Sequence, residues 1–280
     1  MQNLGYYNGK IGLLEEMSVP MLDRVCAFGD GIYDATYSRN HVIYNLEEHV
    51  DRFFSSAAKL RMEMPMTKEE LSQLLSDLVK KVDDGEQFVY FQLTRGTAPR
   101  NHAFPENVKA NLWVMLRAGK IKDNNVPIKL ITLDDTRFLH CDIKTLNLIP
   151  SVMASQKALE AGCEEAVFHR GDIVTECAHS NVSIIENGKF VTHPTDNLIL
   201  PGIARANLIK MCNKLGIPVV EEEFTLERLM KADEIIVSSA GSFCLSASHI
   251  DGKEVGGKAP EILASLRREL VNDFITATEK

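Results

Sequence analysis

Three short stretches of the sequence combine residue types that could do chemistry. The first is CDIKTLNLIP (residues 141–150), in which Ile143 and Leu146 give Lys144 an apolar setting. Most lysines are solvated surface charges, but a lysine amine in a desolvated site can attack a carbonyl carbon and form a Schiff base. This stretch therefore offers a candidate nucleophile.

The other two stretches offer groups that could bind anions. In LPGIAR (residues 200–205) a Pro-Gly pair precedes an expected helix, whose first N–H groups could bind a phosphate, although most helix starts bind nothing. In TRGTAPRNH (residues 94–102) an expected loop gathers Arg95, Arg100 and His102 as two or three possible carboxylate donors. A solvated loop is the ordinary explanation of such a stretch, so each signal is weak alone.

Composition and charge narrow the classes of function. The chain has 280 residues, of which 45% are hydrophobic and 25% charged, as expected of a globular protein with two domains. Its net charge of −8 gives no basic field for nucleic acid or an anionic membrane. We find no secretory signal and no apolar run near the ~20 residues of a membrane helix, so we expect no membrane partner.

The six cysteines are scattered, without a C-x-x-C pair or a Cys/His spacing suited to zinc. We therefore expect reduced thiols, a cytoplasmic location and no metal. Cys141 and Cys177 lie next to the candidate chemistry, and we expect both to be small buried side chains.

Hydrophobic spacing predicts mixed α and β structure in the first half of the chain. A helix is expected over residues 45–61 with Asn45 as its cap, and Thr67 with Glu70 forms a capping box for a second helix. Strands are expected at residues 88–94 and 112–117.

The polar stretch at residues 119–127 breaks both periodicities, and we expect it to link a small N-terminal domain (1–118) to a larger C-terminal domain (128–280). In the second domain we expect strands at 128–133, 165–170, 173–176, 181–186, 189–192, 217–222 and 234–238, and helices at 151–160, 202–215, after Thr225 and at 260–277. Hairpins alternate with helices there, so the domain is not a doubly wound series. Neither a G-x-G-x-x-G nor a P-loop motif is present, which disfavours a dinucleotide or P-loop enzyme.

Six segments between residues 24 and 252 resemble the D-amino acid aminotransferases of the fold-type IV pyridoxal-phosphate enzymes. They are FGDGIYD, EEHVDRFFSSAAKLR, YFQLTRGTAPRNHAFPE, CDIKTLNLIP, VTECAHSNV and LPGIAR, in the family's order and spacing. Any one could arise by chance, but six in order are hard to explain otherwise. The R-x-H step of Arg100 and His102 is the most specific, because it separates D-amino acid enzymes from branched-chain relatives.

The resemblance implies a two-domain α/β fold with pyridoxal 5′-phosphate in the interdomain cleft, and a homodimer. It implies a ping-pong aminotransferase: a D-amino acid, with D-alanine expected, leaves as a 2-oxo acid, and a second 2-oxo acid, with 2-oxoglutarate expected, takes the nitrogen. A branched-chain aminotransferase or an aminodeoxychorismate lyase of the same fold is the nearest alternative. A non-catalytic ligand-binding protein on this scaffold is the alternative from a different class.

The resemblance also implies roles for individual residues. Lys144 would hold the cofactor covalently and carry the substrate proton, and Glu176 would keep the pyridine nitrogen protonated. The other cofactor contacts would be Arg52 on the phosphate, Leu200 on the ring, the N–H groups of Ile203 and Ala204, and a second phosphate loop at Ala240 and Gly241. The trap for the substrate α-carboxylate would be Tyr33, Arg100 and His102, with the last two reaching across from the other subunit.

The chain departs from the family pattern at two places. Relatives often carry serine where this chain has Ala178 and His179, and hydroxyl residues where it has Ala240 and Gly241. Backbone N–H groups can still bind a phosphate at the second place. We expect His179 to be a packed or solvent-facing side chain.

Overall fold

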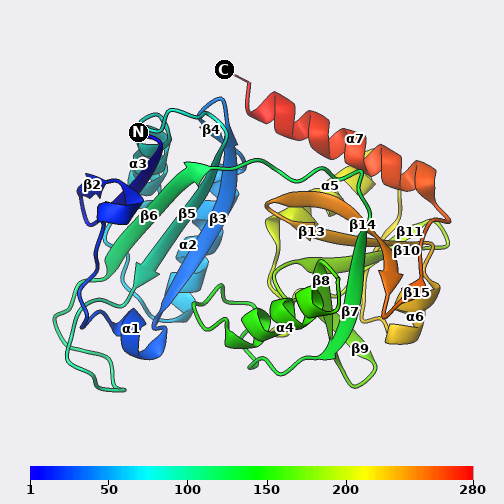
Figure 1. Ribbon diagram of the computed structural model, residues 1–280, viewed down its shortest axis with the longest axis horizontal. Coiled ribbons are helices and arrows are strands. Elements are labelled where there is room, and N and C mark those ends of the chain that lie inside the picture. The colour runs from blue at the N-terminus through cyan, green and yellow to red at the C-terminus, as the bar shows by residue number, and fades with distance from the viewer. Residues whose placement is uncertain (280) are drawn as a thin grey trace. The chain divides into compact units, whose positions relative to one another are not determined.

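The computed structural model describes residues 1–279, and the chain divides into two compact units. One unit comprises Met1–Lys120, Ile143–Asn147 and the end of the chain from Phe274; the other comprises Ile121–Asp142 and Leu148–Asp273. Each contains a β-sheet with helices, so the expected mixed α/β architecture is confirmed (Figure 1). Among the described residues, no helix has both the length and the apolar character needed to cross a membrane.

The first unit is built on a six-stranded antiparallel sheet in the order β2-β1-β6-β5-β3-β4. Its strands are β1 (Asn3–Tyr7), β2 (Lys10–Gly12), β3 (Gly31–Arg39), β4 (Val42–Ile43), β5 (Gln87–Thr94) and β6 (Asn111–Ala118). Its helices are η1 (Leu14–Glu16), α1 (Arg24–Phe28), α2 (Leu46–Lys59) and α3 (Lys68–Val79).

Side-chain alternation gives this sheet one apolar face. In β5, Val89, Phe91 and Leu93 are fully buried and pack with Phe53 of α2 and Leu71 of α3. Because strand side chains alternate, the intervening residues of β5 and β3 point to the opposite face. Helices α2 and α3 therefore cover one face of the sheet (Figure 1). The other face carries aromatic and polar side chains such as Tyr33, Tyr90 and Gln92.

The two helix starts predicted in this unit differ in outcome. Thr67 and Glu70 form the expected capping box of α3. Asn45 does lie at the N-cap of α2, but its backbone is left-handed (φ 52°) and its side chain makes no capping hydrogen bond. A capping side chain needs an extended backbone to reach the N–H groups of the first turn, so the prediction of a side-chain cap is wrong. Asparagine suits this position because it tolerates the left-handed region.

The second unit contains a nine-stranded sheet in the order β12-β11-β10-β13-β14-β7-β8-β9, with β15 paired to β14. Its strands are β7 (Ile128–Asp134), β8 (Glu165–Arg170), β9 (Ile173–Cys177), β10 (Asn181–Glu186), β11 (Lys189–Thr192), β12 (Val219–Glu221), β13 (Glu234–Ser239), β14 (Ser242–Ile250) and β15 (Lys253–Glu254). Helices α4 (Ile149–Glu160), α5 (Ile203–Leu215) and α6 (Leu226–Lys231) belong to it, and α7 (Pro260–Ala277) begins in it. The expected hairpin at Asn187 and Gly188 is confirmed, with φ of 52° and 73°.

Residues 143–147 belong to a different compact unit from the residues on either side of them in the sequence. The sequence groups them with the second domain, but they cluster with the first unit. Thr145 forms a β-bridge with Ile32, and the N–H of Tyr33 donates to the carbonyl of Lys144 at 3.0 Å. Leu146 N–H also donates to the carbonyl of Gly31 at 3.1 Å. These bonds fix the backbone of Lys144 to strand β3.

Candidate functional site

Lys144 lies against an aromatic platform in the first unit. Its Nζ is 4.3 Å from the centroid of the Tyr33 ring, and Tyr33 stacks on Tyr90 with 5.4 Å between ring centroids. The backbone N–H of Lys144 donates to the hydroxyl of Ser56 at 3.4 Å. The negative face of an aromatic ring attracts an ammonium group, so this half-buried lysine is held by both its backbone and its side chain.

Next to Tyr33, the fully buried Asp34 organises two side chains of helix α2. Arg52 donates to both carboxylate oxygens of Asp34 at 2.8 Å, and His49 Nδ1 lies 2.7 Å from Oδ1. Burial alone would raise the pKa of Asp34, but the charges of Arg52 and His49 hold that pKa well below its ordinary value. Burial lowers the pKa of His49, although Asp34 opposes this effect. Arg52, predicted to bind a phosphate, is thus oriented by a charge-assisted bidentate pair.

Arg100 and His102 meet at a second aromatic ring. The guanidinium carbon of Arg100 lies 5.0 Å from the centroid of Phe28, and the ring of His102 lies 5.1 Å from the same centroid. Both side chains are exposed. Arg24 holds their loop in place, because it donates to the carbonyl of Asn101 at 2.5 Å. The structure therefore brings the two predicted carboxylate donors together on Phe28.

Arg95, the third cation of that stretch, has a structural environment. Its Nε donates to Asp30 at 2.9 Å and its NH2 group donates to the carbonyl of Leu60 at 3.0 Å. Its guanidinium carbon also lies 3.7 Å from the centroid of Phe104. Of the two or three possible donors, Arg100 and His102 remain candidates.

In the second unit, Glu176 at the end of β9 is only 5% exposed. Its Oε2 accepts hydrogen bonds from the amide of Asn181 and from the backbone N–H of Leu200, both at 3.0 Å. Its Oε1 forms an ion pair with Arg137, which is also paired with the buried Asp135 at 2.8 Å. The guanidinium and the two N–H donors favour the charged form of this buried carboxylate, which could pair with a protonated nitrogen of a ligand.

Two further segments of this unit could bind a phosphate. Helix α5 has Gly202 at its N-cap, with no side-chain cap on its first N–H groups. A Cβ at Gly202 would lie 1.9 Å from Oδ1 of Asn181, so only glycine fits beside the side chain that holds Glu176. Helix α5 packs against β13 and β14, whose connecting turn contains Ala240 and Gly241. Ser239 and Ser242 flank that turn, with their hydroxyls 2.8 Å apart.

The predicted residues thus fall into groups. Lys144, Tyr33 and Arg52 gather around strand β3, whereas Arg100 and His102 gather at Phe28, all in the first unit. The second unit contains Glu176, Leu200, Ile203, Ala204, Ala240 and Gly241. Leu200 bonds directly to Glu176 through its N–H, and Ile203 and Ala204 form the first turn of α5.

The residues that hold these side chains, notably Asp34, Arg137 and Asn181, were not predicted from the sequence. One signal was available: Asp34 shares the buried alternation of β3 with Ile32 and Thr36, and a carboxylate at such a position requires a buried partner. Arg137 carries no comparable signal, because its partner Glu176 is remote in sequence.

Two cysteines and a histidine near these residues also have predicted environments. Cys141 and Cys177 are buried as expected, and burial raises the pKa of Cys141 to about 11 and that of Cys177 well above its ordinary value. Both thiols therefore stay protonated near neutral pH. His179 is solvent-facing, 56% exposed, with Nδ1 2.8 Å from the buried carboxylate of Glu165.

Comparison with known proteins places the chain in a family. The sequence pattern of the family described as Amino-transferase class IV matches residues 31–250. This chain belongs to the class IV aminotransferases. A D-alanine aminotransferase of Listeria monocytogenes serotype 4b (strain F2365) is 40% identical over 269 residues, covering 94% of this chain and 93% of the relative. A D-alanine aminotransferase of Bacillus licheniformis is 34% identical over 279 residues, covering 98% of each.

A solved structure supports the same fold for this class IV aminotransferase. The branched-chain amino acid aminotransferase of Escherichia coli matches with a TM-score of 0.90 at 20% identity, covering 100% of this chain and 97% of that chain. This likeness concerns the fold alone. Together with the family match, it confirms the expected fold-type IV architecture and the family resemblance.

The buried charge cluster at Asp34 leads to a stability prediction. Asp34→Asn keeps the side-chain size but leaves Arg52 without its counter-charge, so we expect the free energy of unfolding near neutral pH to fall by about 3–5 kcal/mol. The folded pKa of Asp34 lies below its ordinary value of 3.8, so the wild-type advantage is complete above that pH and shrinks as the pH falls below it. Urea unfolding at about pH 7, 5 and 3 measures this difference.

Asp51→Asn, also on α2, is the matched control. Asp51 pairs with Lys68 at 2.5 Å, but the two side chains are 63% and 47% exposed. Its loss should cost less than about 1 kcal/mol. An equal loss in both variants, or a difference between Asp34→Asn and wild type that is as large at pH 3 as at pH 7, would contradict the assigned role of Asp34.

Proposed function

We propose that this class IV aminotransferase is pyridoxal-phosphate dependent and transfers the amino group of D-alanine to a 2-oxo acid such as 2-oxoglutarate, in a ping-pong cycle. The observation that carries the proposal is the position of Lys144. Its amine lies over Tyr33, the neighbour in β3 of the Asp34 that pairs with Arg52, in a chain 40% identical to a D-alanine aminotransferase. Two-substrate cycles through a modified enzyme are typical of nucleophilic catalysis.

The residues present fit a pyridoxal phosphate. For the phosphate we assign Arg52, the α5 N–H groups of Ile203 and Ala204, and the turn at Ala240 and Gly241. The α5 N-terminus has no side-chain cap, which supports this assignment, because uncapped N–H groups are favourable partners of an anion. For the pyridine nitrogen we assign the ionised Glu176, and for the ring face Leu200.

When bound, the protonated pyridine ring accepts the electron pair released from the substrate Cα. We assign the removal of the Cα proton to the amine of Lys144. A free lysine amine is a general base, and the amine of Lys144 would remain close to the cofactor that it binds. Glu176 keeps a proton on the ring nitrogen, and Arg137, Asn181 and the N–H of Leu200 keep Glu176 ionised and in place.

The substrate carboxylate is assigned to Tyr33, Arg100 and His102. Arg100 and His102 are exposed on their own chain, which supports a homodimer in which each loop reaches the site of the partner subunit. Helix α4 supports a homodimer too, because its apolar side chains Ile149, Val152 and Met153 are more than half exposed. We further propose a cytoplasmic location, in accord with six free thiols.

The first test is Lys144→Ala. We expect steady-state turnover of D-alanine with 2-oxoglutarate to fall below about 1% of wild type, since general acid–base catalysis alone contributes ~10²–10⁴-fold. The variant should also fail to hold pyridoxal phosphate through gel filtration, as followed by its visible absorption. Lys10→Ala, an exposed lysine of β2, is the matched control and should keep both properties. Turnover above a few per cent of wild type in Lys144→Ala would sink the assignment.

Glu176→Gln separates cofactor binding from proton removal. A neutral amide no longer favours a proton on the pyridine nitrogen, so we expect bound cofactor but a slower first half-reaction with D-alanine, by about tenfold or more. Stopped-flow absorbance under single-turnover conditions measures that rate, with the exposed Glu227→Gln as control. A rate equal to wild type would mean that another acid serves the ring.

Arg100→Leu tests where the carboxylate binds and hence the handedness of the substrate. Losing a hydrogen bond to a charged group costs about 1.5–3 kcal/mol, so kcat/KM for D-alanine should fall at least about tenfold, and the D/L ratio with it. The exposed Arg268→Leu serves as control. Chiral analysis of the alanine formed from pyruvate completes the test. Predominantly L-alanine from the wild-type enzyme would favour the branched-chain alternative, and pyruvate release without an acceptor would favour the lyase.

A further inference from the structure

One histidine of the second unit has a buried nitrogen that the proposed aminotransferase chemistry does not use. His193 follows β11 and is 1% exposed. Its Nδ1 lies 2.9 Å from the carbonyl oxygen of Pro194, which can only accept a hydrogen bond. The tautomer that fits this contact carries its hydrogen on Nδ1 and a lone pair on Nε2. Within residues 1–279, this buried Nε2 has no hydrogen-bond partner.

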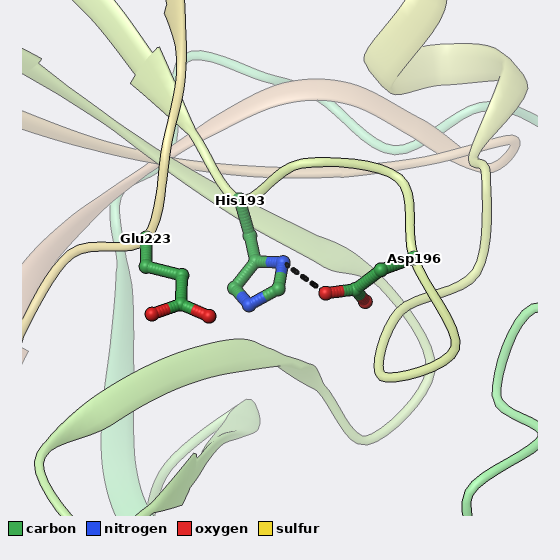
Figure 2. Close-up of side chains that lie close together, drawn as sticks. All are labelled: His193, Asp196 and Glu223. Carbon is green, nitrogen blue, oxygen red and sulfur yellow. Dashed lines mark ion pairs between the residues drawn. The ribbon is translucent and has the colours of Figure 1, made fainter.

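Two carboxylates flank this imidazole. Asp196 comes from the same loop, with Oδ2 3.9 Å from Nδ1 of His193, and Glu223 follows strand β12. One ligand atom from each of the three residues lies within 4.8 Å of the others. Figure 2 shows the imidazole ring between the two carboxylates: Nδ1 faces Asp196, and the other ring nitrogen lies on the side of Glu223. In the described part of the chain, no lysine or arginine forms an ion pair with the carboxylate of Asp196 or Glu223; Arg228 donates to the backbone carbonyl of Glu223 at 3.5 Å and pairs with Glu222.

We propose that His193, Asp196 and Glu223 bind a divalent transition-metal cation of the Zn²⁺ or Mn²⁺ type. A neutral imidazole with two carboxylates carries a charge of about −2, which such a cation neutralises, and nitrogen with oxygen is a ligand set that Zn²⁺ accepts. The bond from Nδ1 to a backbone carbonyl is the usual second partner of a metal-binding histidine, since it fixes the ring and leaves Nε2 for the ion.

Metal binding requires a small closure of the cluster. Bonds of about 2.0–2.2 Å to Zn²⁺ place ligand atoms roughly 3.3–3.5 Å apart. The carboxylates can supply this movement, because Asp196 is 34% exposed and Glu223 is exposed, whereas His193 is buried and fixed. The buried nitrogen therefore defines the site, and the two carboxylates close on it.

The cation would fasten the loop that leads to helix α5. This loop runs from His193 to Gly202, and its residues Leu198 and Leu200 bond to Arg137 and Glu176. The carbonyl of His193 accepts from Arg205 of α5 at 2.8 Å. Since Glu223 follows strand β12, which pairs in parallel with β11, a bound ion joins this loop to the end of the neighbouring strand. We therefore expect binding to raise the melting temperature.

The test uses the full-length holoenzyme without a polyhistidine tag, dialysed against EDTA. Titration with ZnCl₂ in a calorimeter should give a single saturable equivalent, and excess Zn²⁺ should raise Tm by about 5 °C. Glu223→Gln and His193→Gln should each weaken Zn²⁺ binding by about tenfold or more, since each removes a charge or a ligand atom. Glu222→Gln, an exposed neighbour that pairs with Arg228, is the matched control and should bind as wild type.

Circular dichroism shows whether His193→Gln is folded. If it is not, Glu223→Gln still tests the site, because the side chain that it changes is exposed. Anomalous diffraction at the zinc edge from a soaked crystal should place the ion at His193. The proposal is overturned if wild type shows no saturable binding, if both cluster variants bind as wild type, or if the anomalous peak lies elsewhere. None of these outcomes depends on aminotransferase activity, so the site and the proposed function can fail separately.

Discussion

The second unit depends on one buried charge, the carboxylate of Glu176. It joins strand β9, the start of β10 through Asn181, the loop before α5 through Leu200, and the segment after β7 through Arg137. Burying an ionised carboxylate is costly unless charged and hydrogen-bonding partners compensate it. These partners therefore have to lie where they are, and the approach of the chain to helix α5 is set by the same bonds. Asp34 has the same role in the first unit, where it joins β3 to α2 through Arg52 and His49.

Local patterns predicted much of this fold. Strands β8, β10 and β11 and helix α7 were expected within a residue of their limits, because alternation, the Asn187-Gly188 turn and helical spacing are local signals. Strands β3 and β14 were missed, since each buries polar side chains: Asp34 lies in the core face of β3, and Ser246 is buried in β14. Such residues look like loop or surface until their partners are known, and those partners are remote in sequence.

The candidate site, like the fold, was predicted only where its signals are local in the sequence. Lys144, Glu176 and the LPGIAR helix start were found because their residue types and family spacing are specific. The grouping of Lys144 with the first unit was not, since it rests on a β-bridge between Thr145 and Ile32 that no local pattern encodes. The cluster of His193, Asp196 and Glu223 was missed for a related reason: Glu223 follows another strand, and the spacing of cysteines and histidines in the sequence carries no signal for such a grouping.

Arg95 and Arg100 show how the environment separates two identical side chains. The N–H groups of Arg95 donate to Asp30 and to the carbonyl of Leu60, so few of them remain to bind a ligand. The guanidinium carbon of Arg100 lies instead over the ring of Phe28, 5.0 Å from its centroid. Attraction to a ring face does not occupy a carboxylate acceptor's place on the N–H groups, so the same contact can orient Arg100 without competing with a substrate. His102 leans on the same ring, so one apolar residue, Phe28, places both donors.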